Sequence, residues 1–182
     1  MIYVFLASGF EEIEAVTAID ILRRCALEVT TVSVCESRSV RGAHGIYALA
    51  DCLIGESDFA DAAAVVLPGG MPGTENLAAN EKLKEIISRA ADGGAVIAAV
   101  CAAPLVLGRM GLLSGRRACC FPGFEEELCG AEVTRERTVT DGRIITSRGA
   151  GTAHDFAAAI AAALGCREKA ERVISSMLYD AH

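Results

Sequence analysis

The chain has 182 residues, of which 52% are hydrophobic and 23% are charged. This composition predicts one folded domain spanning residues 1–182 and excludes intrinsic disorder, which needs low hydropathy and high net charge. The 17 Lys and Arg residues against 24 Asp and Glu residues give a formal net charge of −7. Because no Lys- or Arg-rich run interrupts this acidic balance, a nucleic-acid-binding protein is excluded.

Neither a membrane protein nor a disulfide scaffold is expected. The best candidate for a membrane span, residues 95–107, falls short of the roughly 18 apolar residues that a bilayer requires. The N-terminus has no basic segment before its first apolar run, so no signal peptide is predicted. We therefore expect a cytoplasmic protein whose eight cysteines are thiols. Their spacing contains no Cys-x-x-Cys pair and no histidine at ligand distance, so no metal site is predicted.

The first 35 residues predict a β-α-β unit. A continuous apolar run at residues 2–7 is typical of a strand buried on both faces. Ser8 and Glu11 match the capping-box pattern and predict a helix that continues to about Cys25. Its apolar face is formed by residues spaced three apart: Ile13, Val16, Ile19 and Leu22. Residues 28–34, rich in Thr and Val, predict a second strand, and the unit as a whole indicates a parallel sheet.

The rest of the chain continues this alternation. Further strands are predicted over residues 62–67, 95–100 and, as shorter pieces, 116–147. Further helices are predicted over residues 80–91, 102–110, 152–164 and 167–178. Residues 41–50 suggest a short hairpin or an excursion, Asp141-Gly142 a turn, and Thr152 with Asp155 a second capping box. The alternation predicts a doubly wound α/β sandwich with a mostly parallel central sheet.

Cys101 is the sharpest candidate for chemistry. In open α/β sheets ligands bind beyond the carboxyl ends of the strands, and Cys101 follows the most apolar strand and precedes a helix. Small neighbours allow the strained strand-to-helix turn that exposes a nucleophile, although alanines replace the usual glycines here. A helix N-terminus favours the thiolate form. The alternative is a small buried apolar residue, the common fate of cysteine. The other seven cysteines lack this context and are interpreted as structural.

Two further segments end at the same edge of the predicted sheet. Pro68-Gly69-Gly70 follows a strand, and its amide N–H groups could form an oxyanion hole, or the segment could be a plain loop. Glu14 lies at the edge of the apolar stripe of the first helix. A partly buried carboxyl group there would have a raised pKa and could hydrogen-bond a thiolate, although acidic residues also suit a helix N-terminus.

Four segments carry a resemblance that covers nearly the whole chain: residues 7–14 (ASGFEEIE), 66–70 (VLPGG), 97–104 (IAAVCAAP) and 145–152 (ITSRGAGT). In this order they resemble the ThiJ/PfpI superfamily, specifically its parkinsonism-associated deglycase branch. The resemblance implies a flavodoxin-like sandwich, a homodimer and an activity that needs no cofactor. It maps family site residues onto six positions: Cys101 as nucleophile, Glu14 as the acid that holds it, Gly69, Gly70 and Ala102 as oxyanion amides, and His44 as a basic residue near the site.

Two departures from the family pattern bear on function. Protease-like members place a histidine directly after the cysteine, where this chain has Ala102, so peptidase activity is not expected. Some members of the deglycase branch carry a histidine before Pro122, where this chain has Phe121. The resemblance therefore leaves the proton donor for a glyoxalase step unassigned. Of the other histidines, His154 and His182 are expected to be solvated.

Two functions from different classes remain open. In the first, the Cys101 thiolate adds to a reactive carbonyl such as methylglyoxal, Glu14 moves protons, and the product is a hydroxy acid or a protein freed of its glycation adduct. In the second, the chain is a redox-sensing stress protein or chaperone in which Cys101 is oxidised to sulfinic acid and Glu14 stabilises it. Two other possibilities lack support: no residue argues for thiazole biosynthesis, and an amidotransferase needs a late His-x-Glu pair that is absent from the sequence.

Overall fold

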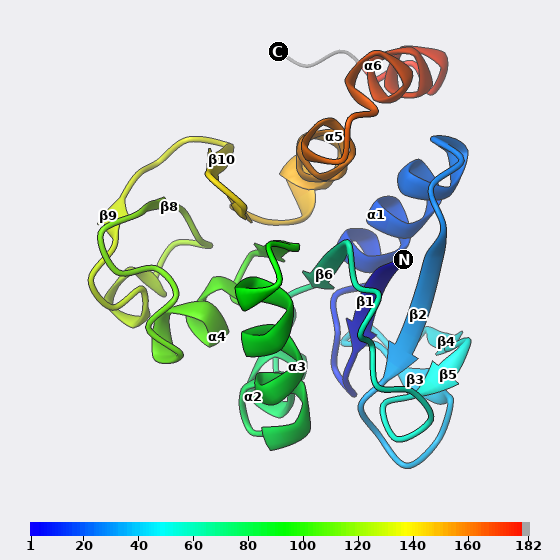
Figure 1. The fold of residues 1–182 in the computed structure, drawn as a ribbon. Coiled ribbons are helices and arrows are strands. Elements are labelled where there is room, and N and C mark those ends of the chain that lie inside the picture. Colours follow the sequence, from blue (N-terminus) through cyan, green and yellow to red (C-terminus); the bar gives the residue numbers. More distant parts are fainter. Residues whose placement is uncertain (180–182) are drawn as a thin grey trace.

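The computed structural model describes residues 1–179, and a seven-stranded sheet forms its centre (Figure 1). The strands stand in the order β10-β11-β7-β6-β1-β2-β5. They are β1 (Ile2–Leu6), β2 (Val29–Ser33), β5 (Cys52–Leu53), β6 (Ala64–Leu67), β7 (Val96–Val100), β10 (Thr138–Asp141) and β11 (Ile144–Ser147). Every neighbouring pair is parallel except β10 with β11. The predicted fold class, a doubly wound flavodoxin-like sandwich, is confirmed.

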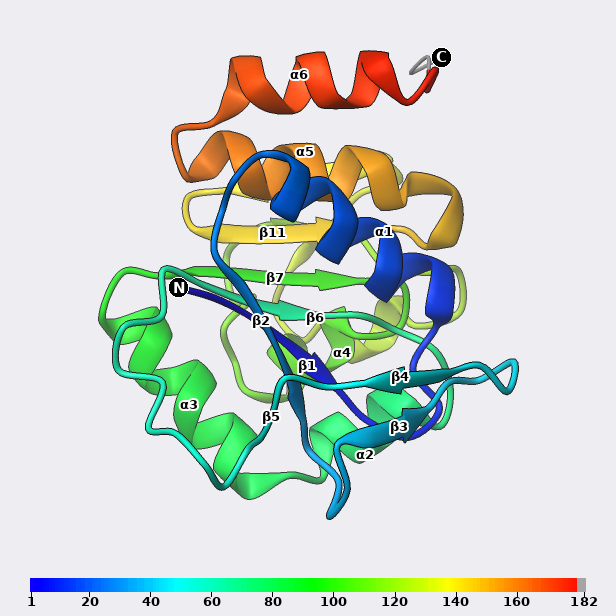
Figure 2. The ribbon, with the colours of Figure 1, turned by 90° about the vertical axis from the view of Figure 1, so that its right-hand side faces the viewer.

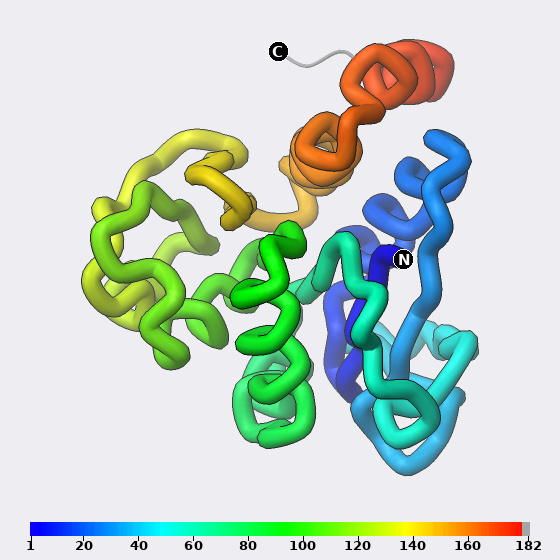
Figure 3. The backbone as a smooth tube through the Cα atoms, in the orientation of Figure 1, coloured from blue at the N-terminus to red at the C-terminus, as the bar shows by residue number. Residues whose placement is uncertain are grey.

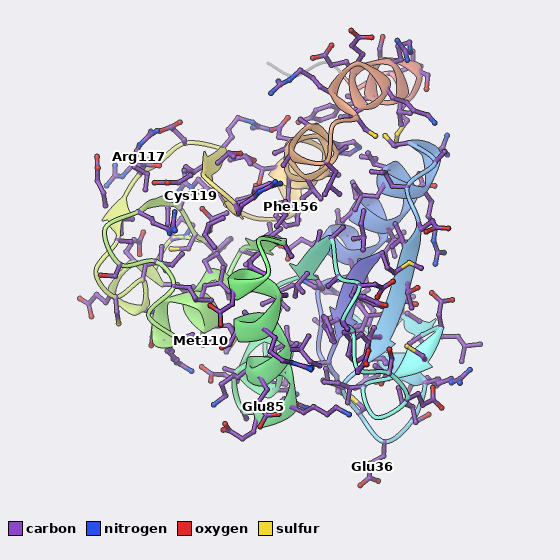
Figure 4. The ribbon with its side chains drawn as sticks, viewed as in Figure 1. Glu36, Glu85, Met110, Arg117, Cys119 and Phe156 are labelled. Carbon is purple, nitrogen blue, oxygen red and sulfur yellow. The ribbon has the colours of Figure 1, made fainter. Side chains whose placement is uncertain are left out.

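Helices cover both faces of this sheet, as the two ribbon views make visible (Figure 1, Figure 2). One face carries α1 (Glu12–Arg24), α5 (Ala153–Ala163) and α6 (Arg167–Ser176). The other carries α2 (Gly73–Ala78), α3 (Glu81–Asp92) and α4 (Pro104–Arg109). Each layer has its own apolar cluster against the sheet, because the strands are buried on both faces. Phe156 of α5 is fully buried, whereas acidic residues such as Glu36 and Glu85 project into solvent (Figure 4).

Two small sheets complete the architecture. The predicted hairpin is present as the antiparallel pair β3 (Ser39–Arg41) and β4 (Tyr47–Leu49). The second sheet is the parallel pair β8 (Arg117–Ala118) and β9 (Glu132–Val133), in the long excursion between α4 and β10 that Figure 3 traces beside the main sheet. No helix among residues 1–179 has both the length and the apolar character needed to cross a membrane.

The helix of residues 80–91 was predicted correctly in its position and in its buried face. Asn80 caps α3 by accepting a hydrogen bond from the Leu83 N–H at 2.9 Å, which satisfies one of the free donors at the start of the helix. Its four predicted apolar positions are all buried: Leu83, Ile86, Ile87 and Ala90. A strongly periodic amphipathic segment with a good N-cap residue therefore specified this element locally.

The start of α1 differs from the prediction. The helix is capped by Glu11, whose carboxylate accepts from the Glu14 N–H at 2.7 Å, and not by Ser8. The chain turns between the two residues because Phe10 is buried and pairs with Gly42 before the helix begins. A buried residue at this point delays the helix by one turn.

The predicted apolar face of α1 is correct only in part, since Leu22 is buried and Ile19 is partly buried but the other two predicted residues are not. Ile13 and Val16 are each 55% exposed. The buried face consists of the following residues: Glu12, Glu14, Ala15, Ala18, Ile21 and Leu22. Small residues on this face let α5 pack closely against α1, and this tertiary contact outweighs the spacing of the larger side chains.

The second capping box is likewise absent. The Thr152 side chain makes no cap bond to α5, and its hydroxyl group instead donates to the Gly149 carbonyl at 2.9 Å. It also lies 2.7 Å from the Ser147 hydroxyl group. Thr152 thus holds together the loop that follows β11 rather than the helix after it.

Candidate active site

The loops that follow β1, β6, β7 and β11 meet at one edge of the sheet, where parallel strands end together (Figure 2). Backbone hydrogen bonds tie these loops to one another. The Cys101 N–H donates to the Ser147 carbonyl at 2.9 Å, which joins the ends of β7 and β11. The Glu11 N–H donates to the Gly69 carbonyl at 2.8 Å, which joins the ends of β1 and β6. The structure therefore brings the loops that carry Cys101, Gly69 and the start of α1 to one place, together with the loop that follows β11.

Cys101 occupies the strained turn that the sequence suggested. Its φ angle is +64°, in the left-handed region that residues with a side chain rarely adopt. The turn is held from both sides, because the Cys101 carbonyl also accepts from the Phe121 N–H at 2.8 Å. Its neighbours Ala102 and Ala103 are buried, while Cys101 itself is partly exposed. This is the geometry of a nucleophile elbow, and such strain clusters at functional sites.

Glu14 projects from the first turn of α1 into the same place and is fully buried. Its Oε2 accepts a hydrogen bond from the Gly69 N–H at 2.8 Å. Its other carboxylate oxygen, Oε1, is buried and has no hydrogen-bond partner among residues 1–179. The Cys101 thiol lies beside this carboxyl group and lowers its pKa through a hydrogen bond. The two side chains are so close that a Cβ atom on Gly69 would lie 2.7 Å from Cys101 Cβ and 2.9 Å from Glu14 Oε2. A buried carboxylate oxygen without a donor favours the protonated acid, which is the form that can hydrogen-bond a sulfur anion.

The electrostatics of the pair follow from this burial. Burial raises the pKa of Glu14 to about 7, against the opposing hydrogen bonds from Gly69 and Cys101. Burial, followed by the charge of the ionised Glu14, raises the pKa of Cys101 to about 12. The two groups therefore do not both ionise near neutral pH: the Cys101 thiol keeps its proton, and Glu14 is the group that titrates.

The expected lowering of the Cys101 pKa by a helix dipole is not found. The helix α4 begins only at Pro104 and has six residues, so Cys101 lies outside its first turn. Burial and the nearby carboxylate dominate instead, and they act in the opposite direction. These two effects, and not the field of the helix, determine the pKa of the Cys101 thiol.

Two backbone N–H groups lie beside the Cys101 sulfur. Those of Gly70 and Ala102 donate toward Cys101 and lower its pKa. Gly70 has φ +89°, and a Cβ atom there would lie 2.7 Å from the Gly9 carbonyl oxygen, so only glycine fits. The Gly69 N–H is already used by Glu14, which gives Gly69 a different role from the expected one: it holds the acid rather than an oxyanion.

His44 stands away from the Cys101–Glu14 pair, in the turn of the hairpin. Its Nδ1 lies 2.8 Å from the Glu12 carboxylate, which also accepts from the His44 N–H at 2.8 Å. This contact raises the pKa of His44 and lowers that of Glu12. The contacts of the described residues tie His44 to the start of α1 and not to Cys101. Its role in substrate binding stays a prediction.

One group of side chains in residues 1–179 has its potential metal ligands close enough to hold a cation. It consists of Glu11, Glu12 and His44, whose ligand atoms all lie within 4.8 Å of one another. Glu12 already accepts the hydrogen bonds from His44, so this cluster is satisfied without an ion. Of the other histidines, His154 stacks on Tyr179 with ring centroids 4.2 Å apart, and His182 lies outside the described residues.

The side chain of Phe121 and the backbone of Gly149 flank the carboxyl group on its other side. A Cβ atom on Gly149 would lie 3.3 Å from the Phe121 ring and 3.9 Å from Glu14 Oε1. Phe121 is about half exposed, so it forms part of the rim of the site. In the sequence, Phe121 stands out only because it occupies the place of a histidine in some relatives. Its position at the rim was not predictable, because residues of a loop follow no periodic pattern.

Comparisons with known proteins agree with this fold. The family model described as DJ-1/PfpI family matches residues 1–163. DJ-1 homolog A of Arabidopsis thaliana is 40% identical over 178 residues, which are 95% of this chain and 45% of the plant protein. A deglycase of Pyrococcus abyssi is 30% identical over 149 residues, 81% of this chain and 89% of that protein. An oxidised DJ-1 structure from Toxoplasma gondii superposes with a TM-score of 0.92 at 33% identity, covering 99% of this chain and 98% of that one.

The chain belongs to the DJ-1/PfpI family. The resemblance inferred from the four sequence segments is confirmed. The chain spans less than half the length of the two Arabidopsis relatives that it matches.

Proposed function

We propose that the protein is a cofactor-independent enzyme that acts on reactive carbonyl compounds, of the glyoxalase or protein deglycase type. The observation that carries the proposal is the buried Glu14 carboxyl group, with a pKa raised to about 7, beside the partly exposed Cys101 thiol. A related protein from Pyrococcus abyssi bears the name deglycase, which supports the same class of substrate. The substrates are a small carbonyl compound or a glycated protein.

The reaction with methylglyoxal follows from the geometry. Cys101 adds to the aldehyde carbon while Glu14 takes the thiol proton, and the carbonyl oxygen is held by the Gly70 and Ala102 N–H groups before it is protonated. Glu14 then moves the proton from the former aldehyde carbon to the adjacent ketone carbon, which leaves a lactoyl thioester on Cys101. Water hydrolyses the thioester to lactate and restores the thiol.

The test is direct. The purified chain is incubated with methylglyoxal, and lactate is quantified with and without prior alkylation by iodoacetamide. We expect lactate formation that alkylation abolishes, with Cys101 as the residue whose modification follows the loss of activity. An untreated protein that makes no lactate and removes no glycation adduct from a modified peptide contradicts the proposal.

A second function, peroxide sensing at the same thiol, is favoured by the raised pKa of Glu14. A protonated Glu14 can donate a hydrogen bond to a sulfinate on Cys101 and stabilise that oxidation state. After mild peroxide treatment, peptide mass spectrometry should find Cys101 as the first of the eight cysteines to gain two oxygens. Earlier oxidation of the exposed Cys129 to the same state would rule this function out. Since all eight cysteines are free thiols, both functions suit the proposed cytoplasmic location.

We also propose a homodimer built on exposed apolar side chains of α1 and the hairpin. This surface, the α1–hairpin patch, consists of Ile13, Val16, Ile46, Tyr47 and Leu49. The Ile46 N–H donates to Glu12 at 3.4 Å, which places the hairpin turn beside the first turn of α1, and both ribbons lie together in Figure 2. Contiguous apolar surface of this kind is typical of an interface.

Val16→Glu is expected to convert the dimer to a monomer, because it places a charge within an apolar interface. Light scattering coupled to size exclusion should report half the mass of the wild type. The matched control is Val133→Glu, an exposed valine on β9 outside the patch, which should stay dimeric. A dimeric Val16→Glu protein would place the interface elsewhere.

A further inference from the structure

We propose that a cavity between the excursion after α4 and the end of β11 binds a small anion that carries a carboxylate or phosphate group. The cavity has a volume of about 330 Å³, at the lower end of the range for ligand pockets. Six residues line it: Cys120, Glu125, Val133, Thr134, Arg135 and Arg148. Two of them are arginines, whose planar guanidinium groups match the oxygens of carboxylate and phosphate groups.

Neither of these arginines is neutralised by an ion pair. Within residues 1–179 no carboxylate forms a salt bridge with the side chain of Arg135 or Arg148, and neither side chain donates a hydrogen bond. Other arginines of the same excursion differ, because Arg116, Arg117 and Arg137 each pair with an aspartate or a glutamate. Two guanidinium groups that face one cavity with their donors unused favour an anionic ligand.

The backbone holds both arginines at the cavity. The Arg148 N–H donates to the Arg137 carbonyl at 3.1 Å, directly after the end of β11. On the other side, Arg135 follows Thr134, whose N–H donates to the Ala118 carbonyl at 2.8 Å. The Thr134 hydroxyl group accepts a backbone hydrogen bond at 3.4 Å, which leaves its own proton for a ligand. The donors are therefore supplied by two segments that are already in place, which lowers the cost of ordering them on binding.

Glu125 is the acidic residue that lines the cavity, and its charge opposes an anionic ligand. Its carboxylate accepts from the Gly123 N–H at 2.6 Å. Backbone hydrogen bonds lower the pKa of Glu125, and the charges of Arg135 and Arg148 lower it further. Both guanidinium groups thus act on a carboxylate at the cavity, as they would on a ligand. Two arginines against one glutamate leave the lining with a net positive charge.

The cavity borders the candidate active site but is separate from it. Cys120 in its wall precedes Phe121, whose N–H donates to the Cys101 carbonyl at 2.8 Å. Arg148 precedes Gly149, whose backbone flanks the buried carboxyl group. An anion in the cavity therefore contacts residues next to both segments that frame the thiol. The proposal concerns binding alone and does not depend on the reaction proposed for Cys101.

The experiment titrates the full chain with sodium phosphate and, in a second arm, with sodium succinate, by isothermal titration calorimetry at low ionic strength. We expect saturable binding of one anion per chain that weakens as sodium chloride is added. Arg148→Gln should weaken binding by about tenfold or more, because it removes a charge-assisted hydrogen bond. Glu125→Gln should tighten binding by about two- to fivefold, because it removes the opposing charge.

The matched control is Arg172→Gln, which makes the same change of charge at an exposed position of α6. It should bind both anions as tightly as the wild type. Saturable binding of only one of the two anions supports the proposal and assigns the group that the cavity holds.

A wild type that binds neither anion saturably overturns the proposal. Binding that falls equally in Arg148→Gln and Arg172→Gln reflects only the net charge of the chain and overturns it as well. Should Arg148→Gln fail to fold by circular dichroism, Glu125→Gln decides, because unchanged or weaker binding in that variant contradicts a site beside Glu125.

Discussion

Cys101→Ala is expected to reduce lactate formation from methylglyoxal to the uncatalysed level, a loss of about 10³-fold or more in kcat/KM. The reason is that the proposed reaction passes through a covalent bond to the Cys101 sulfur, which no neighbouring group can replace. The variant should fold normally, because alanine fits a turn already surrounded by Ala102 and Ala103. The measurement is the initial rate of lactate formation, with circular dichroism as the check on folding.

The matched control for this loss is Cys120→Ala. Cys120 is buried, and burial raises its pKa to about 12, as it does for Cys101. It lies one residue before Phe121, but Cys120 and the Glu14 carboxyl group do not shift each other's pKa. We expect it to retain most of the activity. Equal activity of the wild type and Cys101→Ala would show that the carbonyl chemistry, if present, occurs elsewhere on the protein.

The sequence suggested this candidate site because three kinds of signal coincide at one sheet edge, although each signal alone left a structural alternative open and the family resemblance joined them. An apolar strand followed by Cys101, a glycine pair after another strand and an acidic residue near the first helix all meet where parallel strands end. The direction of the Cys101 pKa was not predictable in the same way. It depends on how deeply Glu14 is buried and how close its charge lies, and neither is encoded in local spacing.

The errors in the fold have a common physical origin. The predictions for α1 and for the start of α5 relied on local patterns, yet tertiary contacts decided both. Ile13 and Val16 were placed in the core by their spacing, but the small residues of α1 pack against α5 and leave both side chains exposed. Thr152 matched a capping motif, but a bond to Gly149 engages its hydroxyl group. In α3, by contrast, the local pattern and the packing agree, and the prediction was correct.

The rotated face of α1 has a consequence for the chemistry. A helix with Ile13 and Val16 inside would turn Glu14 toward its edge, where water would keep the pKa of the carboxyl group near 4.5. Because Ala15 and Ala18 face the core instead, Glu14 is drawn fully inside and its pKa rises to about 7. The same rotation that exposes the α1–hairpin patch thus produces the raised pKa that the proposed mechanism requires.

Glu14→Gln is expected to lower kcat by about 10²–10⁴-fold, because the variant removes the group that takes the thiol proton. The substitution conserves shape: the amide oxygen can still accept from the Gly69 N–H. In the wild type, kcat/KM should rise as the pH passes about 7, where Glu14 loses its proton and becomes a base. This step should be missing from the profile of the variant. The measurement is the pH dependence of lactate formation for both proteins.

The unfolding free energies of the wild type and Glu14→Gln give an independent check on the pKa of Glu14, because the direction of their change with pH can be predicted. Because the native pKa of Glu14 lies above its ordinary value of 4.5, the folded state holds this proton more tightly than the unfolded state. The Glu14 contribution to stability is therefore complete below pH 4.5 and is lost as the pH rises to about 7. Relative to the wild type, Glu14→Gln should gain about 3 kcal/mol in unfolding free energy between pH 4 and pH 8, measured with urea.

The matched control for both measurements is Glu12→Gln, in the same turn of α1. Glu12 is also buried, but its hydrogen bonds from His44 lower its pKa, so its contribution to stability has the opposite pH dependence. Glu12→Gln should lose stability above pH 5 rather than gain it, and it should keep the activity step near pH 7. If Glu14→Gln retained that step, the group with the pKa of about 7 in the reaction would not be Glu14. The base that takes the thiol proton would then be a different group.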